Sequence, residues 1–145
     1  MTDPVKTLVA AGLPETALRP VAPNYVEEPR GRWHGRAVAI VAPSDTAEVA
    51  AILRACAGTG TPVIPFGGGT GLVGGQLAED GTPPVILSLE RMRAIRDVLP
   101  EENVLVCEAG VILADIQQAA DGVGRLFPLS LGSQGSARIG GLLST

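Results

Sequence analysis

The stretch PVIPFGGGTGLVGGQ, from Pro62 to Gln76, joins a short apolar run to a loop in which six of nine residues are glycine. One or two glycines supply the positive φ angles that a tight turn between strands needs. Six exceed that need, so we interpret the loop as a place where a ligand approaches the main chain, rather than as a flexible connection. Successive N–H groups in such a loop form a concave anion site, to which Thr70 adds a hydroxyl donor.

Two better-known phosphate-binding motifs fit this loop poorly. A P-loop requires a lysine after its last glycine, and the only lysine of the chain is Lys6. The run from Gly69 to Gly74 matches the GxGxxG pattern of dinucleotide-binding folds, and Glu90 follows at the spacing of a ribose-binding acid. That pattern must open a helix, however, and the turn residues 81–84 leave no room for one. The sequence therefore favours a loop that binds a diphosphate with its own amides.

The residues before the loop have the pattern of a βαβ unit. Residues 37–43 form an apolar, partly β-branched run that ends at a proline, which is typical of a buried strand. Asp45 and Glu48 have the spacing of a helix cap. An apolar stripe typical of a helix follows, formed by Val49, Ile52, Leu53 and Cys56. Gly58 and Gly60 would end this helix. With the strand at 62–66, this order predicts two parallel strands.

The pattern changes after the loop. We expect a third strand over 85–89, two antiparallel strands on either side of a turn at 100–103, and an amphipathic helix over 112–120. The segment after residue 124 has the composition of a loop with a second, sparser set of glycines. Residues 1–36 are interpreted as an arm with one short helix over 5–11. Its basic patch, 30–36, fits a solvated arm that packs Trp33 on the domain, or contact with an anionic ligand.

Composition limits the function further. The chain has 145 residues, 46% of them hydrophobic, and a net charge of −4, which indicates one globular domain and argues against a nucleic-acid partner. No apolar run reaches the ~18 residues that span a bilayer. The N-terminus carries acids and prolines instead of a secretory signal, so we expect a cytoplasmic protein. With two unpaired-looking cysteines and His34 as the only histidine, we predict no metal site and assign no catalytic residue.

Three stretches together resemble a known family. They are VAPSDTAEVAAILRAC, PVIPFGGGTGLVGGQ and FPLSLGSQGSARIGGLLST. In this order they are similar to the N-terminal part of FAD-linked oxidases and dehydrogenases of the vanillyl-alcohol-oxidase, or p-cresol-methylhydroxylase, type. The similarity is strongest to the branch of glycolate oxidase FAD subunits and of D-lactate and D-2-hydroxyglutarate dehydrogenases. It implies an α+β fold with a parallel first half and the start of an antiparallel second half. The FAD-binding domain would cover 37–145 and be incomplete at its C-terminus.

The resemblance also implies a set of cofactor-binding residues. The first glycine loop would wrap the diphosphate of FAD, and the second segment would pass near the flavin and its ribityl chain. The residues at these positions are Gly67, Gly68, Gly69, Thr70, Gly71 and Leu72, followed by Gly135, Ser136, Ile139, Gly140, Gly141 and Thr145. Some relatives attach FAD through a histidine near the first loop, and since none stands there, we expect non-covalent FAD.

The family's reaction passes a hydride from the α-carbon of a D-2-hydroxyacid to flavin and leaves a 2-oxoacid. A quinone or an electron-transfer flavoprotein would then reoxidise the flavin. The chain stops at Thr145, where the family continues with Asn-Ala-Gly-Gly and a substrate domain, so we expect this chain alone to be inactive. Two alternatives stay open: a truncated, non-catalytic flavin-binding module that needs a partner chain, and a NAD-binding domain that uses the literal GxGxxG.

Overall fold

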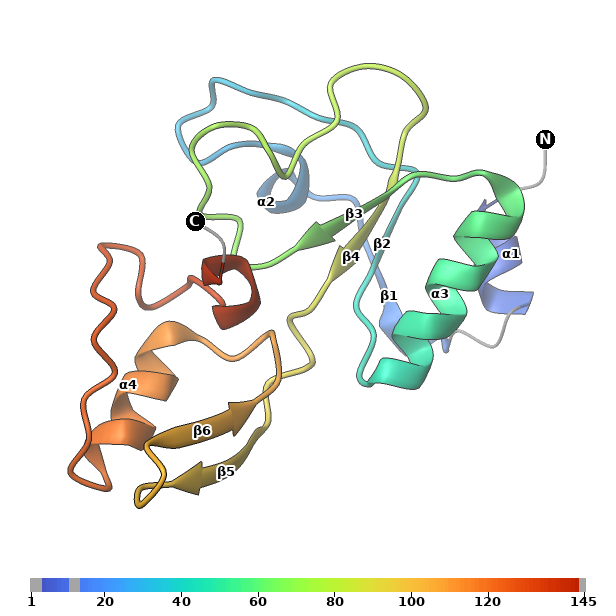
Figure 1. The fold of residues 1–145 in the computed structure, drawn as a ribbon. Helices are drawn as coiled ribbons and strands as arrows, with labels where there is room; N and C mark the ends of the chain where they lie inside the picture. The colour runs from blue at the N-terminus through green and yellow to red at the C-terminus, as the bar shows by residue number, and fades with distance from the viewer. Residues whose placement is uncertain (1–3, 11–13, 144–145) are drawn as a thin grey trace.

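The computed structural model describes residues 4–10 and 14–143, and its first half is built on a four-stranded sheet (Figure 1). The strands are β1 (Leu18–Arg19), β2 (Ala39–Val41), β3 (Val63–Phe66) and β4 (Val85–Ser88), in the order β1-β2-β4-β3. β2, β4 and β3 run parallel, while β1 is antiparallel to β2. The predicted parallel pattern is thus confirmed, with β4 inserted between the two strands of the βαβ unit.

Side chains alternate between the two faces of this sheet, and each face packs against its own apolar cluster. On one face, Val41 and Leu87 pack with Ile52 of α3 (Thr46–Thr59) and with Leu8 of α1 (Pro4–Ala10). On the other face lies a smaller cluster, in which Tyr25 of α2 packs with Ile40, Phe66 and Ile86. α2 spans Pro23–Val26. Because segments from 4–36 contribute to both clusters, the start of the chain is part of the core.

Helix α3 begins and ends largely as its sequence indicates. The Asp45 carboxylate accepts a hydrogen bond from the Glu48 amide at 2.8 Å, and the Glu48 carboxylate accepts one from the Ser44 amide at 2.7 Å. The helix ends at Gly60, whose φ of 66° is left-handed. Gly58 lies inside the helix instead of ending it. Leu53 is 46% exposed, because the side of the helix that faces the sheet is narrower than the predicted stripe.

The second half begins with the predicted hairpin. β5 (Ile95–Leu99) and β6 (Val104–Cys107) pair antiparallel, and α4 (Leu113–Asp121) follows (Figure 1). α4 begins one residue after the predicted start, so that its buried side is formed by Leu113, Ile116 and Ala120. Two 3₁₀ turns, Glu15–Ala17 and Ile139–Leu142, complete the regular structure. Among the described helices, none has the length and apolar character required to cross a bilayer.

The cap of α3 makes a quantitative prediction. Replacing Asp45 with alanine leaves the Glu48 amide without its side-chain acceptor. We expect the free energy of unfolding to fall by about 1 kcal/mol, measured by urea denaturation. Asp45→Ser is the matched control, because serine supplies an acceptor at the same position. Equal losses in both variants would show that the cap bond contributes nothing.

Candidate cofactor site

The glycine loop leaves the carboxyl end of β3, beside the carboxyl end of β4. This is the edge at which open parallel sheets bind their ligands. Residues 67–84 are all described and contain neither a helix nor a strand. The GxGxxG match therefore opens no helix, as its sequence context indicates, and the geometry of a dinucleotide-binding helix is missing from this loop.

Three carbonyl oxygens of the loop accept hydrogen bonds from the protein, whereas the loop amides have no acceptor among the described residues. The carbonyl of Gly71 accepts from the Gln76 side chain at 2.9 Å, that of Gly74 from the Leu77 amide at 2.9 Å, and that of Leu72 from Arg30. Within the described part of the chain, no main-chain N–H from residue 67 to residue 76 donates a hydrogen bond. Unpaired amides of a closely turned loop are the donors that an anion site requires.

The basic segment of the arm supports this loop. Arg30 bonds through Nε to the buried carboxylate of Glu28 at 2.8 Å, and through its other end to the loop carbonyl of Leu72. Trp33 packs on Gly74, where a Cβ atom would lie 3.4 Å from the indole ring, and remains 42% exposed. These contacts agree with the interpretation of an arm that packs Trp33 on the domain.

Part of the glycine content is explained by the protein itself. A Cβ atom on Gly68 would overlap the carbonyl oxygen of Ser136, because the second glycine segment crosses the loop at this point. Gly69 has a φ of 67°, and a Cβ atom there would lie 2.8 Å from the Phe66 ring. At Gly67, by contrast, the nearest atom would be the Arg138 Cβ, at 3.8 Å. Gly67 therefore leaves space open that the packing of the protein does not require.

A cavity of about 560 Å³ lies between the two glycine segments. Its wall includes the first loop, 67–71, together with Gly75 and Gln76, and residues of the second segment. Of the twelve predicted cofactor residues, the cavity is lined by Gly67, Gly68, Gly69, Thr70, Gly71 and Gly141. Leu72, Gly135 and Ser136 do not line it and are exposed, while Thr145 lies outside the described residues. The structure thus brings six of the predicted residues together.

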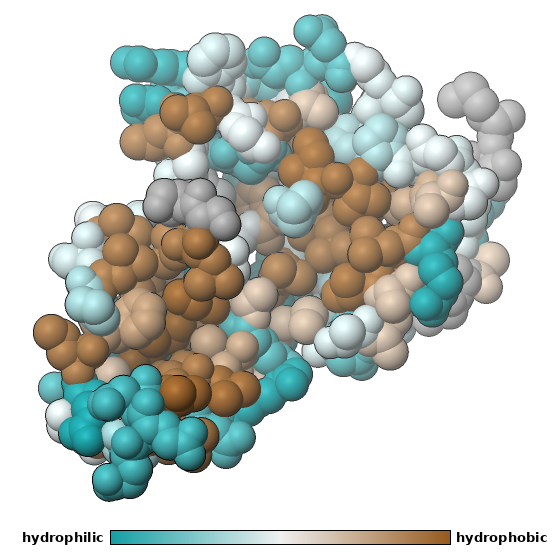
Figure 2. Space-filling view, viewed as in Figure 1, coloured by the Kyte–Doolittle hydropathy of each residue, from teal (hydrophilic) through white to brown (hydrophobic). Residues whose placement is uncertain are grey.

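Ile139 and Gly140 line a different cavity. It measures about 580 Å³, is largely apolar, and lies between the β5–β6 hairpin, α4 and the chain after α4. Figure 2 shows the apolar surface over this region. A Cβ atom on Gly140 would lie 2.8 Å from the Ala109 Cβ, so this glycine is required by close packing within the second half.

Arg138 lines the glycine-loop cavity and was not among the predicted residues. One guanidinium nitrogen donates to the Gly110 carbonyl at 2.7 Å, while the buried Nε has no hydrogen-bond partner in the described chain. Burial lowers the pKa of Arg138, which the carboxylate of Glu90 partly offsets. The sequence offered one signal for this residue. Arg138 is a positively charged residue inside the second glycine segment, at a position that the family pattern leaves variable.

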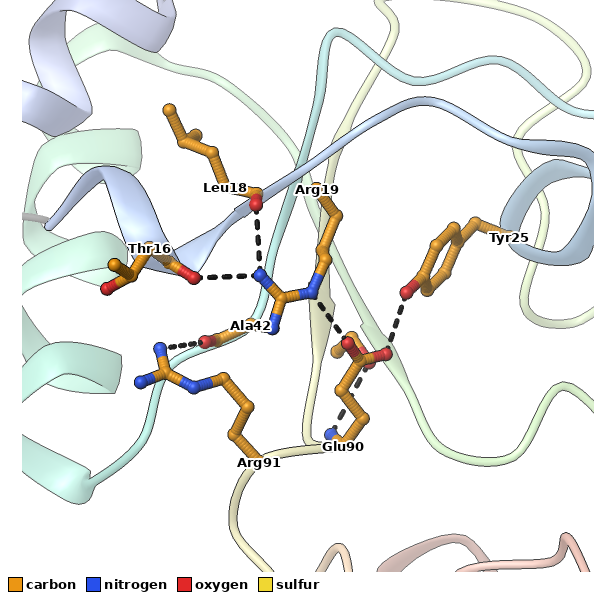
Figure 3. A network of polar contacts seen from close by, with 8 residues as sticks. Thr16, Leu18, Arg19, Tyr25, Ala42, Glu90 and Arg91 are labelled. Atoms are coloured by element: carbon orange, nitrogen blue, oxygen red, sulfur yellow. Dashed lines mark hydrogen bonds and ion pairs between the residues drawn. The ribbon is translucent and has the colours of Figure 1, made fainter.

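Glu90 is the centre of a polar network under the loop (Figure 3). Its carboxylate accepts from Arg19 at 2.8 Å, from the Tyr25 hydroxyl at 2.7 Å and from the Ser88 hydroxyl at 3.0 Å. Burial alone would raise the pKa of Glu90, but these hydrogen bonds outweigh it and hold the pKa below its usual value. The network fixes the arm, through Arg19 and Tyr25, to the end of β4.

The Glu90 network predicts acid sensitivity. Because the folded pKa is lowered, its stabilisation is complete above the unfolded pKa and is lost as the pH falls through the folded one. We expect the difference in unfolding free energy between the wild type and Glu90→Gln to shrink from about pH 6 to about pH 3, measured by urea denaturation. Glu79→Gln, on the exposed loop, is the control. A difference that is independent of pH would contradict the assignment.

The crossing at Gly68 yields a second prediction. In Gly68→Ala the methyl group meets the main chain of Ser136, and we expect a loss of about 1–3 kcal/mol in unfolding free energy. The adjacent Gly67→Ala variant adds the same methyl group at an ordinary contact distance, 3.8 Å from the Arg138 Cβ atom, and should keep the wild-type stability. Thermal and urea unfolding of the two variants provide the comparison. Equal stability of both variants would disprove the crossing.

Comparison with known proteins places this geometry in a family. Residues 37–145 match the family described as FAD binding domain. The chain is 38% identical over 115 residues to a probable mitochondrial D-2-hydroxyglutarate dehydrogenase of Oryza sativa subsp. indica, which covers 79% of this chain and 20% of the relative. It is 32% identical over 148 residues to the D-2-hydroxyglutarate dehydrogenase of Xanthomonas citri pv. viticola, covering 100% of this chain and 31% of that protein. The chain thus spans at most a third of the length of these curated relatives.

Solved structures show the same fold at lower sequence identity. An alkyldihydroxyacetonephosphate synthase superposes with a TM-score of 0.85 at 19% identity, over 100% of this chain and 28% of that chain. A xylooligosaccharide oxidase from Myceliophthora thermophila C1 superposes with a TM-score of 0.76 at 20% identity, over 97% of this chain and 29% of that chain. The family match and the fold agree with the resemblance found in the sequence. The chain therefore belongs to the FAD binding domain family, of the p-cresol-methylhydroxylase type.

Proposed function

We propose that the complete protein is an FAD-dependent dehydrogenase that oxidises a D-2-hydroxyacid to a 2-oxoacid. The cofactor follows from the family, and the hydroxyacid is supported by relatives named D-2-hydroxyglutarate dehydrogenase in plants and bacteria. Because the chain spans 20% and 31% of the two relatives compared, the activity is proposed for the complete protein. The observation that carries the cofactor assignment is the run of amides without partners in the described protein from residue 67 to residue 76, most of whose residues line a cavity that also contains Arg138.

The residues present fit FAD. The amides of 67–71 would hold the diphosphate, and the open space at Gly67 admits it without displacing a side chain. Leu131, Leu142 and Gly141 would form the opposite wall and keep water from the cofactor. Bound FAD would take up the hydride from the substrate, while this part of the protein contributes binding and orientation.

We also propose that the cofactor is held without a covalent bond. His34 is the only histidine of the given sequence, and it does not line the cavity. Its Nδ1 atom lies 3.8 Å from the Oε1 atom of Glu27. Acid precipitation should therefore release the flavin. For reoxidation we propose a quinone or an electron-transfer flavoprotein, and for location the cytoplasm.

The proposed reaction is tested with the protein produced from its complete coding sequence and loaded with FAD. Under anaerobic conditions, D-2-hydroxyglutarate or D-lactate should bleach the absorbance of oxidised flavin, and the L-enantiomers should leave it unchanged. FAD at about 100 times its Kd should stabilise the protein by about 2.7 kcal/mol, whereas NADH should not. Failure of a panel of D-2-hydroxyacids to reduce the flavin would overturn the proposal, and protection by NADH alone would favour the dinucleotide-binding alternative.

A further inference from the structure

The charge distribution of the glycine-loop cavity is uneven. Its lining is made of glycines, small polar residues and apolar side chains, and Arg138 is the one charged residue in the described lining. The loop itself carries no lysine, so the sequence predicted anion binding by amides and the Thr70 hydroxyl, without a cation. The structure brings a cation to the loop from a distant part of the chain, because Arg138 of the second glycine segment lines the same cavity.

Arg138 is fixed in position but is not neutralised by a partner. Its bond to the Gly110 carbonyl orients the guanidinium, while the buried Nε donates to no described group. No carboxylate of the described chain forms an ion pair with it. The carboxylate that acts on it electrostatically is that of Glu90, which Arg19, Tyr25 and Ser88 already occupy. The Nε atom is itself closed to solvent, so a ligand in the cavity would meet the terminal nitrogens of the guanidinium, one of which already donates to the Gly110 carbonyl.

The chemistry of a guanidinium beside unpaired amides selects a particular part of the cofactor. Guanidinium groups bind phosphate oxygens through paired, charge-assisted hydrogen bonds. The oxidised flavin ring and the ribityl chain are uncharged, so the diphosphate is the part of FAD that such a site recognises. We propose that Arg138 binds the diphosphate of FAD, together with the amides of 67–71. This inference rests on the FAD-binding part of the proposed function and is independent of the substrate.

The decisive variants change the charge of Arg138 and of one neighbour. Arg138→Met removes the guanidinium, and Arg138→Lys keeps a positive charge without the forked donors. Arg93→Met is the matched control, because Arg93 is exposed, acts on Arg138 electrostatically and does not line the cavity. Melting temperatures of the FAD-free proteins report whether each variant is folded.

Affinities for FAD and ADP are measured by calorimetry on the protein produced from its complete coding sequence. We expect Arg138→Met to weaken both ligands about tenfold to a hundredfold, as the loss of a charged hydrogen bond implies, and Arg138→Lys to lie in between. Arg93→Met should change neither affinity by more than about twofold, since an exposed charge is screened. The midpoint potential of the bound flavin should stay unchanged in all variants.

The outcomes separate the alternatives. Unchanged FAD and ADP affinities in a folded Arg138→Met variant would overturn the inference and leave the proposed function intact. A shifted flavin potential with an unchanged ADP affinity would place Arg138 at the ring and also overturn it. If the wild type binds no FAD, the proposed function itself fails, and this inference fails with it.

Discussion

The two glycine-rich segments meet where the main chain of Ser136 crosses over Gly68. This crossing requires a residue without a side chain, because any Cβ atom would overlap the carbonyl group of Ser136, a residue whose N–H donates to the Ser133 carbonyl in a turn. It joins the loop after β3 to the segment after α4, which belong to different halves of the fold (Figure 1). The cavity is lined by residues of both segments that this contact brings together.

Side chains around the loop hold its main chain by hydrogen bonds. Arg30 and Gln76 occupy loop carbonyls, and Arg30 is itself fixed by a buried carboxylate. These carbonyl groups are held by side chains, and the amides of the loop stay without partners in the described chain. An anion site made of main-chain groups thus depends on supporting side chains, and the N-terminal arm supplies one that does not line the cavity, Arg30.

Local patterns predicted most of the elements but not their order. The apolar run of β2, the capping residues of α3 and the hairpin of β5 and β6 can all be recognised from neighbouring residues, and the structure confirms them. The position of β4 between β2 and β3 depends on contacts across the sheet, which periodicity does not encode. The same holds for β1, a two-residue strand whose identity comes from its pairing with β2. The Arg138 contact was missed for this reason, since its relation to the loop is purely tertiary.

The second glycine segment shows that one motif serves two purposes. Gly140 and Gly141 are adjacent in sequence, but Gly140 packs against Ala109 and borders the apolar cavity, while Gly141 lines the glycine-loop cavity. A Cβ atom on Gly140 would lie too close to Ala109, at 2.8 Å from its Cβ atom. At Gly141, no atom lies within 4 Å of the Cβ position. Resemblance to a family motif treats both glycines as cofactor residues. Packing distinguishes them, because one is required by the protein and the other leaves room for a ligand.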